Sequence, residues 1–275
     1  ATKAANIIGY PAVVKRVDSS GSRGITVVKC DEDISEAFAN AIDKSQRDYV
    51  LVEGFINGVE IGVDGFVQGG KIAFLAQHAK FVYNSKTTTV PVGHAFPYNC
   101  SQAVYNEIYK QMQLAVTAAG ADKCSINADV FVDGEAVHVI EVGGRTGATC
   151  IPELISGYYG FDFYEKMILS ALGEDVDFET GEGTPCMAKL LLSPVEGTIT
   201  RIDEDGINEI AKERGAEISI DFPVGHKVFA MNDGTDRFGH VIAKTADEAE
   251  LDSIISEVRA CIEIDGKPLE EIWKK

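Results

Sequence analysis

The chain has 275 residues, 45% of them hydrophobic and 25% charged, so it is long enough to bury a large core and to hold two or three subdomains. Its formal net charge of −18 excludes the clustered basic surface on which nucleic-acid binding depends. The sequence has no apolar run long enough to span a membrane and no signal-peptide pattern, so we expect a cytoplasmic protein without a membrane partner. The six cysteines are widely spaced, which predicts reduced, buried thiols.

The first predicted strand, residues 12–17, places Lys15 after three apolar residues. A Gly/Ser-rich loop at residues 18–24 joins it to a second predicted strand at residues 25–28. Such a loop can offer several backbone N–H groups to a phosphate, because its small side chains allow close approach. Two plainer interpretations stay open at this point, namely a strand lysine that faces solvent and an ordinary flexible hairpin.

An amphipathic helix is predicted at residues 34–42, where apolar residues recur at helical spacing. A predicted strand at residues 49–52 then runs into a short linker, residues 53–60, that begins with Glu53 and ends with Glu60. A linker of this kind can hold a planar base through its backbone groups, while a carboxylate binds the hydroxyl groups of a ribose.

Residues 84–97 are predicted to form a long loop after a hairpin that turns at Gly69-Gly70. Loops of this length without secondary structure are often functional lids. Lys80 lies shortly before the loop and is a candidate phosphate contact. His94 lies within the loop and is a candidate for facing an acceptor substrate. For both residues, a solvated loop position is the alternative.

A helix predicted at residues 101–119 leads to the most informative stretch of the chain. Two β-branched apolar runs, residues 128–132 and 136–142, flank a turn signal and predict a β-hairpin, and each contains one acid, Asp129 and Glu141. An odd-numbered loop would place both carboxylates on one face, whereas a two-residue loop would place them on opposite faces. Two carboxylates on one face repel each other unless a cation lies between them, and oxygen ligands suit Mg²⁺ or Mn²⁺. A pair of solvated edge-strand acids is the alternative.

A glycine-rich segment, residues 143–147, follows the second acid directly and contains Arg145. Its backbone allows close approach, and a planar guanidinium is well matched to an anion. Two further helices are predicted at residues 152–157 and 163–172. Beyond a candidate boundary near residue 181, predicted strands and helices follow one another without an independent chemical motif.

Taken in this order, the features resemble the ATP-grasp superfamily. The resemblance rests on Lys15 before the Gly-rich hairpin, the V-E-x-F-I-x-G-x-E linker at residues 52–60, and the acid hairpin that ends in x-x-R. The V-G-H-A-F-P segment at residues 92–97 and the G-F-D-F run at residues 160–163 resemble the carboxylate–amine ligase branch, which includes the L-amino acid ligases.

The resemblance implies an α/β (α+β) protein in which two α+β lobes clamp a nucleotide and a mainly β C-terminal subdomain packs against them. The implied domains are a small lobe at residues 1–56, a large lobe with the metal site at residues 57–180, and the C-terminal subdomain at residues 181–275. By position, the implied cofactors are ATP and Mg²⁺ or Mn²⁺. The implied metal ligands are Asp129 and Glu141. Lys80 and Arg145 are implied to take part in catalysis, and Arg145 and His94 in substrate binding. The implied nucleotide contacts are Lys15, Ser19, Ser20, Gly21, Ser22, Gly24, Glu53, Gly54, Phe55, Ile56 and Glu60.

The implied reaction is an ADP-forming carbon–nitrogen ligation. A carboxylate attacks the γ-phosphoryl group of ATP to give an acyl phosphate and ADP, and an amine then displaces phosphate to form an amide. A metal ion held by Asp129 and Glu141 would neutralise the charge that develops during transfer. The alternatives are a bicarbonate-using enzyme, similar to biotin carboxylase or carbamoyl-phosphate synthase, and a non-catalytic nucleotide-binding module.

Two features depart from the family pattern. Many relatives carry Asn at the position of Gly143, so a water molecule or Asn127 would have to supply the missing oxygen ligand. Relatives also carry a preceding α/β domain that residues 1–10 do not replace. We therefore expect small carboxylate and amine substrates, and a further domain, a second chain or a homodimer that completes the site.

Overall fold

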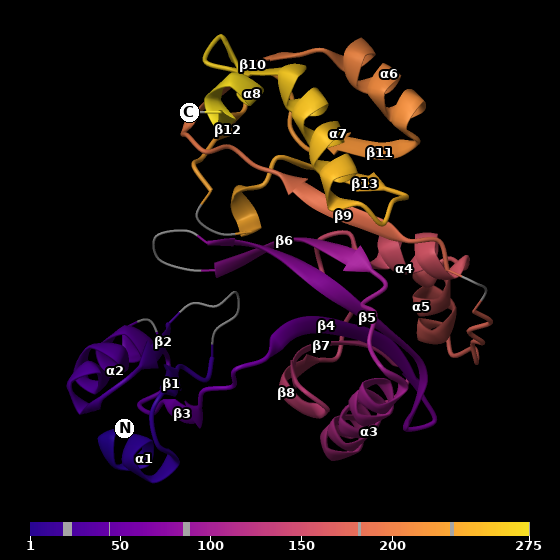
Figure 1. Cartoon of the computed structure of the whole chain (residues 1–275). Coiled ribbons are helices and arrows are strands. Elements are labelled where there is room, and N and C mark those ends of the chain that lie inside the picture. Colours follow the sequence, from indigo (N-terminus) through magenta and orange to yellow (C-terminus); the bar gives the residue numbers. More distant parts are fainter. Residues whose placement is uncertain (19–23, 44, 85–88, 181–182, 232–233, 275) are drawn as a thin grey trace. The chain divides into compact units, whose positions relative to one another are not determined.

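The computed structural model describes residues 1–18, 24–43, 45–84, 89–180, 183–231 and 234–274 (Figure 1). It divides the chain into two compact units, each with its own buried core. The first unit contains Ala1–Asn57 and Asn84–Val90, and the second contains Gly58–Tyr83 and Pro91–Lys275. The finer domain limits expected from the resemblance stay predictions.

The first unit is a small antiparallel sheet with a helix packed against it. The strand order is β2-β1-β3, and the buried side chains come from the sheet, from α2 and, at Ala5, from an N-terminal helix. That N-terminal helix was not predicted, because only one of its side chains is buried and it therefore shows no apolar period. The elements are α1 (Thr2–Ile8), β1 (Ala12–Lys15), β2 (Ile25–Val28), η1 (Asp31–Asp33), α2 (Ile34–Ile42) and β3 (Leu51–Gly54).

The second unit is built on an eight-stranded sheet with the order β11-β13-β9-β6-β5-β4-β7-β8. The described pairings are antiparallel, and together with the helices they confirm the predicted α/β class. The strands are β4 (Val59–Gln68), β5 (Lys71–Asn84), β6 (Thr89–Phe96), β7 (Cys124–Asp133), β8 (Ala136–Gly143), β9 (Cys186–Leu191), β11 (Ala216–Ile220) and β13 (Gly239–Ala243).

The two faces of this sheet are covered differently. Helix α3 (Gln102–Ala119) buries Ile108 and Met112 against one face, with Val63 and Ala128 among the strand residues that it covers. Ser101 caps this helix as predicted, since its hydroxyl oxygen accepts a hydrogen bond from the backbone amide of Val104. On the other face, α4 (Ile151–Tyr159) and α5 (Phe163–Ala171) pack over the aromatic residues at the far end of β4 and β5. Polar side chains from β4, β5, β7 and β8 lie on another part of that second face.

The predicted loop at residues 84–97 is wrong, because Thr89–Phe96 forms strand β6 in the middle of the sheet. Strand β6 pairs with β9, and a Cβ atom at Gly93 would lie 2.2 Å from the backbone oxygen of Ala188. The glycine is therefore needed for close approach of the two strands. Pro91 and Gly93 look like loop residues in sequence, and the strand partner lies far along the chain, so no local pattern reveals β6.

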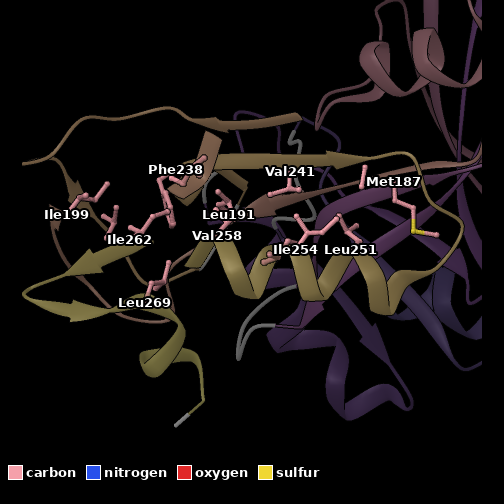
Figure 2. Close-up of a cluster of buried hydrophobic side chains, with 14 of the residues drawn as sticks. Met187, Leu191, Ile199, Phe238, Val241, Leu251, Ile254, Val258, Ile262 and Leu269 are labelled. Atoms are coloured by element: carbon pink, nitrogen blue, oxygen red, sulfur yellow. The ribbon is translucent and has the colours of Figure 1, made fainter. Parts of the chain in front are cut away.

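The C-terminal part contributes β9, β11 and β13 to the large sheet and forms a second sheet with the order β12-β10-β14-β15. Helix α7 buries Leu251, Ile254 and Val258 in the core shown in Figure 2. None of the described helices is both long and apolar enough to cross a membrane. The remaining elements are β10 (Gly197–Ile202), α6 (Glu204–Arg214), β12 (Lys227–Val228), η2 (Gly234–Asp236), α7 (Glu248–Ala260), β14 (Ile262–Ile264), β15 (Lys267–Pro268) and α8 (Leu269–Trp273).

Candidate active site

The hairpin of β7 and β8 makes the two predicted metal ligands cross-strand neighbours. Its loop has two residues, so a regular ladder would pair Asp129 with Ile140 and turn Glu141 to the opposite face. The register shifts instead: Val130 pairs with Val139, and Asp129 pairs with Glu141, which leaves Ile140 as the extra residue of a β-bulge. The bulge therefore places both acidic residues on one face despite the two-residue loop.

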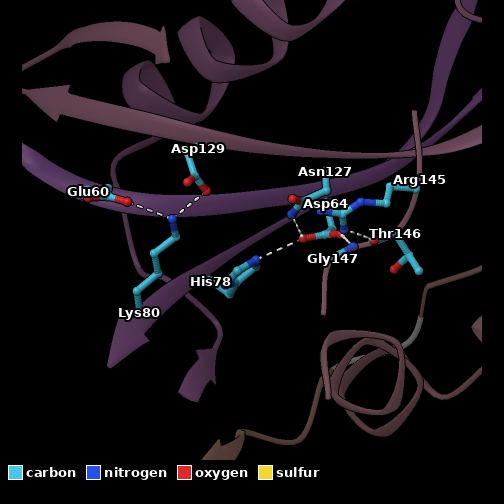
Figure 3. A network of polar contacts seen from close by, with 9 residues as sticks. All are labelled: Glu60, Asp64, His78, Lys80, Asn127, Asp129, Arg145, Thr146 and Gly147. Carbon is cyan, nitrogen blue, oxygen red and sulfur yellow. Dashed lines mark hydrogen bonds and ion pairs between the residues drawn. The ribbon is translucent and has the colours of Figure 1, made fainter. Parts of the chain in front are cut away.

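Four neighbouring strands place polar residues on this face. His78, Gly62, Asp129 and Glu141 follow one another across β5, β4, β7 and β8 as directly paired residues. Two groups can be distinguished, and Figure 3 draws their residues apart from Glu141. We call Glu60, Lys80, Asp129 and Glu141 the charged cluster, and Asp64, His78, Asn127 and Gly147 the buried network.

Lys80 is the cation of the charged cluster. Its ammonium group donates a hydrogen bond of 2.8 Å to Glu60 Oε1 and another to Asp129 Oδ1, and only 6% of its side chain is exposed. Burial by itself lowers the pKa of Lys80, but the negative charges of Asp129 and Glu60 outweigh it and raise the pKa above its ordinary value. Lys80 is therefore held as a cation against the predicted metal ligand.

The charged cluster fits a divalent cation. Asp129 already binds a cationic group, and Glu141 is an exposed cross-strand neighbour on the same face. Among the residues that the structure describes, no three or more His, Cys, Asp or Glu side chains gather in an arrangement that could hold a metal ion. A metal ion at these two carboxylates would thus take its further oxygen ligands from amides, water or phosphate.

The buried network is centred on Asp64, whose side chain is fully buried. Its Oδ2 accepts hydrogen bonds from His78 Nε2 at 3.0 Å and from Asn127 Nδ2 at 2.8 Å, and its Oδ1 accepts one from the Gly147 amide at 2.8 Å. Sequence reasoning missed Asp64 and His78. The available signal was an acid inside an apolar strand, at Val63-Asp64-Gly65, because a carboxylate is buried only when it has partners.

The two histidines pack together in the middle of the sheet. The His78 ring lies over Gly62, where a Cβ atom would come within 1.9 Å of the ring, so this position requires glycine. His94 meets His78 edge-on, with ring centroids 4.6 Å apart. Burial, helped by the neighbouring His78 and Lys80, holds the pKa of His94 well below its ordinary value, so His94 is neutral. His94 is 4% exposed in β6, which contradicts the solvated-loop alternative; its role toward a substrate stays a prediction.

Arg145 lies on the exposed segment that leaves β8. Its Nη1 donates a hydrogen bond of 2.7 Å to the carbonyl oxygen of Thr146. Two residues later the segment packs closely against its neighbours at Gly147. A Cβ atom at this position would lie 2.5 Å from Ile151 Cδ1 and 2.8 Å from Asn127 Nδ2. Glycine at this position therefore lets the backbone reach Asp64, while the guanidinium stays accessible to an anion.

In the first unit, Lys15 forms an ion pair of 2.5 Å with Glu53, which joins two of the predicted nucleotide contacts. Its side chain is 16% exposed, which contradicts the interpretation of a lysine that simply faces solvent. Strands β1 and β3 are paired so that Val13 lies opposite Glu53, two residues from Lys15 on the same face.

The other predicted nucleotide contacts of this unit are only partly described. Ser19, Ser20, Gly21 and Ser22 lie outside the described residues. Gly24 has a φ of 72°, a backbone conformation that favours glycine. Gly54 is the last residue of β3. The Phe55 amide donates a 3.1 Å hydrogen bond to the Pro11 carbonyl, its ring is 45% exposed, and Ile56 is half-buried.

The cysteines supply no nucleophile for this site. All six are free, as predicted, but only Cys150 and Cys186 are buried, and Cys30 is exposed. Cys150 lies nearest in sequence to Arg145, and its burial raises the pKa of the thiol to about 12. The thiol is therefore protonated at neutral pH.

Comparison with known protein families supports this architecture. The model of the ATP-grasp domain matches residues 8–153, and that of the L-amino acid ligase C-terminal domain 2 matches residues 189–266. D-alanine–D-alanine ligase of Trichlorobacter lovleyi is 29% identical over 161 residues, which cover 56% of this chain and 50% of that protein. The chain spans about half the length of the curated relatives it matches.

Solved structures show the same fold. Phosphoribosylglycinamide synthetase of Anaerococcus prevotii is similar with a TM-score of 0.72 and 25% identity, over 96% of this chain and 66% of that one. L-amino acid ligase of Bacillus licheniformis is similar with a TM-score of 0.70 and 19% identity, over 93% of this chain and 63% of that one. Since the ATP-grasp match covers more than half of the chain, including both acids of the hairpin, the chain belongs to the ATP-grasp family.

Proposed function

We propose that the chain is the nucleotide- and metal-binding core of an ADP-forming ligase that activates a carboxylate as an acyl phosphate and joins it to an amine. One observation carries the proposal: Asp129 and Glu141 are cross-strand neighbours, and Lys80 contacts both Asp129 and Glu60 on the same sheet face. Two carboxylates and an ammonium group in this arrangement suit a metal-bound polyphosphate.

The residues of the charged cluster have separate roles in this proposal. Asp129 and Glu141 would hold Mg²⁺, which neutralises charge on the phosphates when it is bound. Lys80 stays cationic because its two acidic neighbours raise its pKa, so it can stabilise negative charge on the transferred phosphoryl group. Arg145 is exposed and would bind either the substrate carboxylate or the acyl phosphate, where its planar fork is well matched.

The nucleotide contacts that the resemblance implies in the first unit, namely Lys15, residues 19–24 and the linker at residues 53–56, stay predictions. Glu60 would bind the ribose. The expected completion of the site by a preceding domain, a second chain or a homodimer stays a prediction, as does the cytoplasmic location. The relatives' names mention D-alanine and L-amino acids, so we propose an amino acid as one of the two substrates.

The test is ATP turnover by the chain with Mg²⁺ and pools of amino acids, with ADP and phosphate measured separately. We expect ADP formation that requires both the metal ion and an acid, and hydroxylamine should trap the acyl phosphate as a hydroxamate. Turnover that requires bicarbonate instead would support the carboxylase-like alternative. Nucleotide binding without turnover in any combination, in a chain completed by the expected further domain, would support the non-catalytic module.

A further inference from the structure

We propose that Asp64 is a positioning residue that turns the side-chain amide of Asn127, so that the amide oxygen becomes the third oxygen ligand of the metal site. In this chain Asn127 would replace the side-chain ligand that Gly143 lacks. The inference rests on the proposed function, because it completes the metal site at Asp129 and Glu141.

The orientation of the amide follows from hydrogen-bond chemistry. A carboxylate only accepts hydrogen bonds, so Asn127 must direct its NH₂ group toward Asp64, as the 2.8 Å contact from Nδ2 to Oδ2 records. Figure 3 shows the contact of the amide nitrogen with Asp64, and the amide oxygen lies on the other branch of the planar group. The opposite orientation would place two acceptors against each other.

The strand register determines what lies on the other side of Asn127. Asn127 pairs with Asp64 on β4 and with Gly143 on β8, so it stands between these two residues. It also precedes Asp129 by two positions in β7 and therefore shares its face. A Cβ atom on Gly143 would meet nothing closer than 3.7 Å, so there is room on the side away from Asp64.

Asp64 is itself fixed before any ligand arrives. It is fully buried, and His78 and the Gly147 amide bond it at 3.0 Å and 2.8 Å in addition to Asn127. A carboxylate with its acceptor positions taken up by fixed N–H donors cannot rotate without leaving a buried group unpaired. The orientation of Asn127 is therefore set by the fold.

A matched exchange of side chains tests the inference. Asp64→Leu removes both acceptor oxygens, so nothing holds the NH₂ group of Asn127 away from the metal site and its amide oxygen is no longer directed there. The double variant Asp64→Asn with Asn127→Asp restores a donor–acceptor pair, keeps the net charge and again directs an oxygen at the site. Asp122→Asn is the control, because Asp122 also accepts a backbone hydrogen bond, from Gly70 at 3.0 Å, but lies outside the site.

The measurement is the affinity for Mn²⁺ in the presence of ADP, from the electron paramagnetic resonance signal of the free ion, with the melting temperature recorded for each variant. We expect Asp64→Leu to weaken Mn²⁺ binding by about 10-fold or more, as is typical when the partner of a metal ligand is changed. The double variant should recover most of this loss, and Asp122→Asn should bind as the wild type does.

Unchanged affinity in Asp64→Leu, or a double variant no better than Asp64→Leu, would overturn the inference. If Asp64→Leu does not fold, Asn127→Ala replaces it: wild-type affinity in that variant also overturns the inference, whereas weaker binding that Gly143→Asn restores in the same chain supports it. Failure of the wild type to bind Mn²⁺ with ADP would instead contradict the proposed function, and the inference with it.

Discussion

Asp129 and Asp64 lie on the same face of one sheet, yet their surroundings differ completely. The side chain of Asp129 is 30% exposed, and its described partner is the side-chain ammonium group of Lys80. Asp64 is fully buried and accepts three hydrogen bonds from groups that the fold holds in place. A partly exposed carboxylate that is paired with a side-chain cation can also bind a ligand from solvent, whereas a buried carboxylate whose two oxygens accept from fixed N–H groups can only hold its neighbours.

The contrast also explains how a charged site is built on a sheet face. Helices α4 and α5 exclude water from the far end of the face, and the buried network follows with every acceptor of Asp64 engaged. Lys80 and Asp129 come next, where the sheet meets solvent. Charge is therefore placed where a ligand can reach it, and the buried carboxylate of Asp64 beneath has partners for both of its oxygens.

The largest effect is expected from the charged cluster. Asp129→Asn or Glu141→Gln should lower Mg²⁺-dependent ADP formation by at least about 100-fold, because each removes an anionic oxygen from the metal site. The melting temperature should stay close to that of the wild type, since both side chains reach solvent. Normal turnover in both variants would contradict the proposed mechanism.

Changes in the buried network should affect the stability of the fold more than those in the charged cluster do. Asp64→Ala leaves the N–H groups of His78, Asn127 and Gly147 unpaired in a buried position, so the free energy of unfolding should fall by about 3–5 kcal/mol. Asp129→Ala should lower it by less than about 1 kcal/mol. Chemical denaturation of both variants measures the difference. Equal losses in the free energy of unfolding would contradict the view that Asp64 stabilises the fold and Asp129 does not.

Lys80 should matter for the reaction more than for the fold. Lys80→Met keeps the length of the apolar stem but removes the cation, and we expect ADP formation to fall by about 10- to 100-fold. The free energy of unfolding should change by about 1 kcal/mol at most, because desolvation of the ammonium group offsets the attraction of its partly exposed partners. A large loss of stability with normal turnover would assign Lys80 to the fold instead.

The smallest effect concerns pH. His94 is neutral in the folded protein because its pKa is lowered well below 6.5, whereas the unfolded chain binds a proton there below about that pH. The unfolded state then holds more protons, so stability should fall as the pH decreases from 6.5, by up to about 1.4 kcal/mol per pH unit. His94→Leu should flatten this part of the profile, measured by denaturation at several pH values. An unchanged slope would contradict a neutral buried His94.

Local sequence alone determined several elements correctly. Helix α3 follows from its apolar spacing, from Ser101 as the cap and from Gly120 as the stop, and the hairpin of β7 and β8 follows from two β-branched runs around a turn signal. The acids at Asp129 and Glu141 were also identifiable, because a charged residue inside an apolar strand is unusual. These features depend on neighbours within a few positions in the chain.

Only the tertiary structure decided how those acids are used. With the two-residue loop alone, Asp129 and Glu141 would lie on opposite faces of the sheet, and the bulge at Ile140 places them on the same face. The same holds for β6, whose partner is distant, and for Asp64, whose donors come from three other segments. Register shifts and buried hydrogen bonds join residues far apart in sequence, and their energies depend on packing that no short stretch of residues encodes.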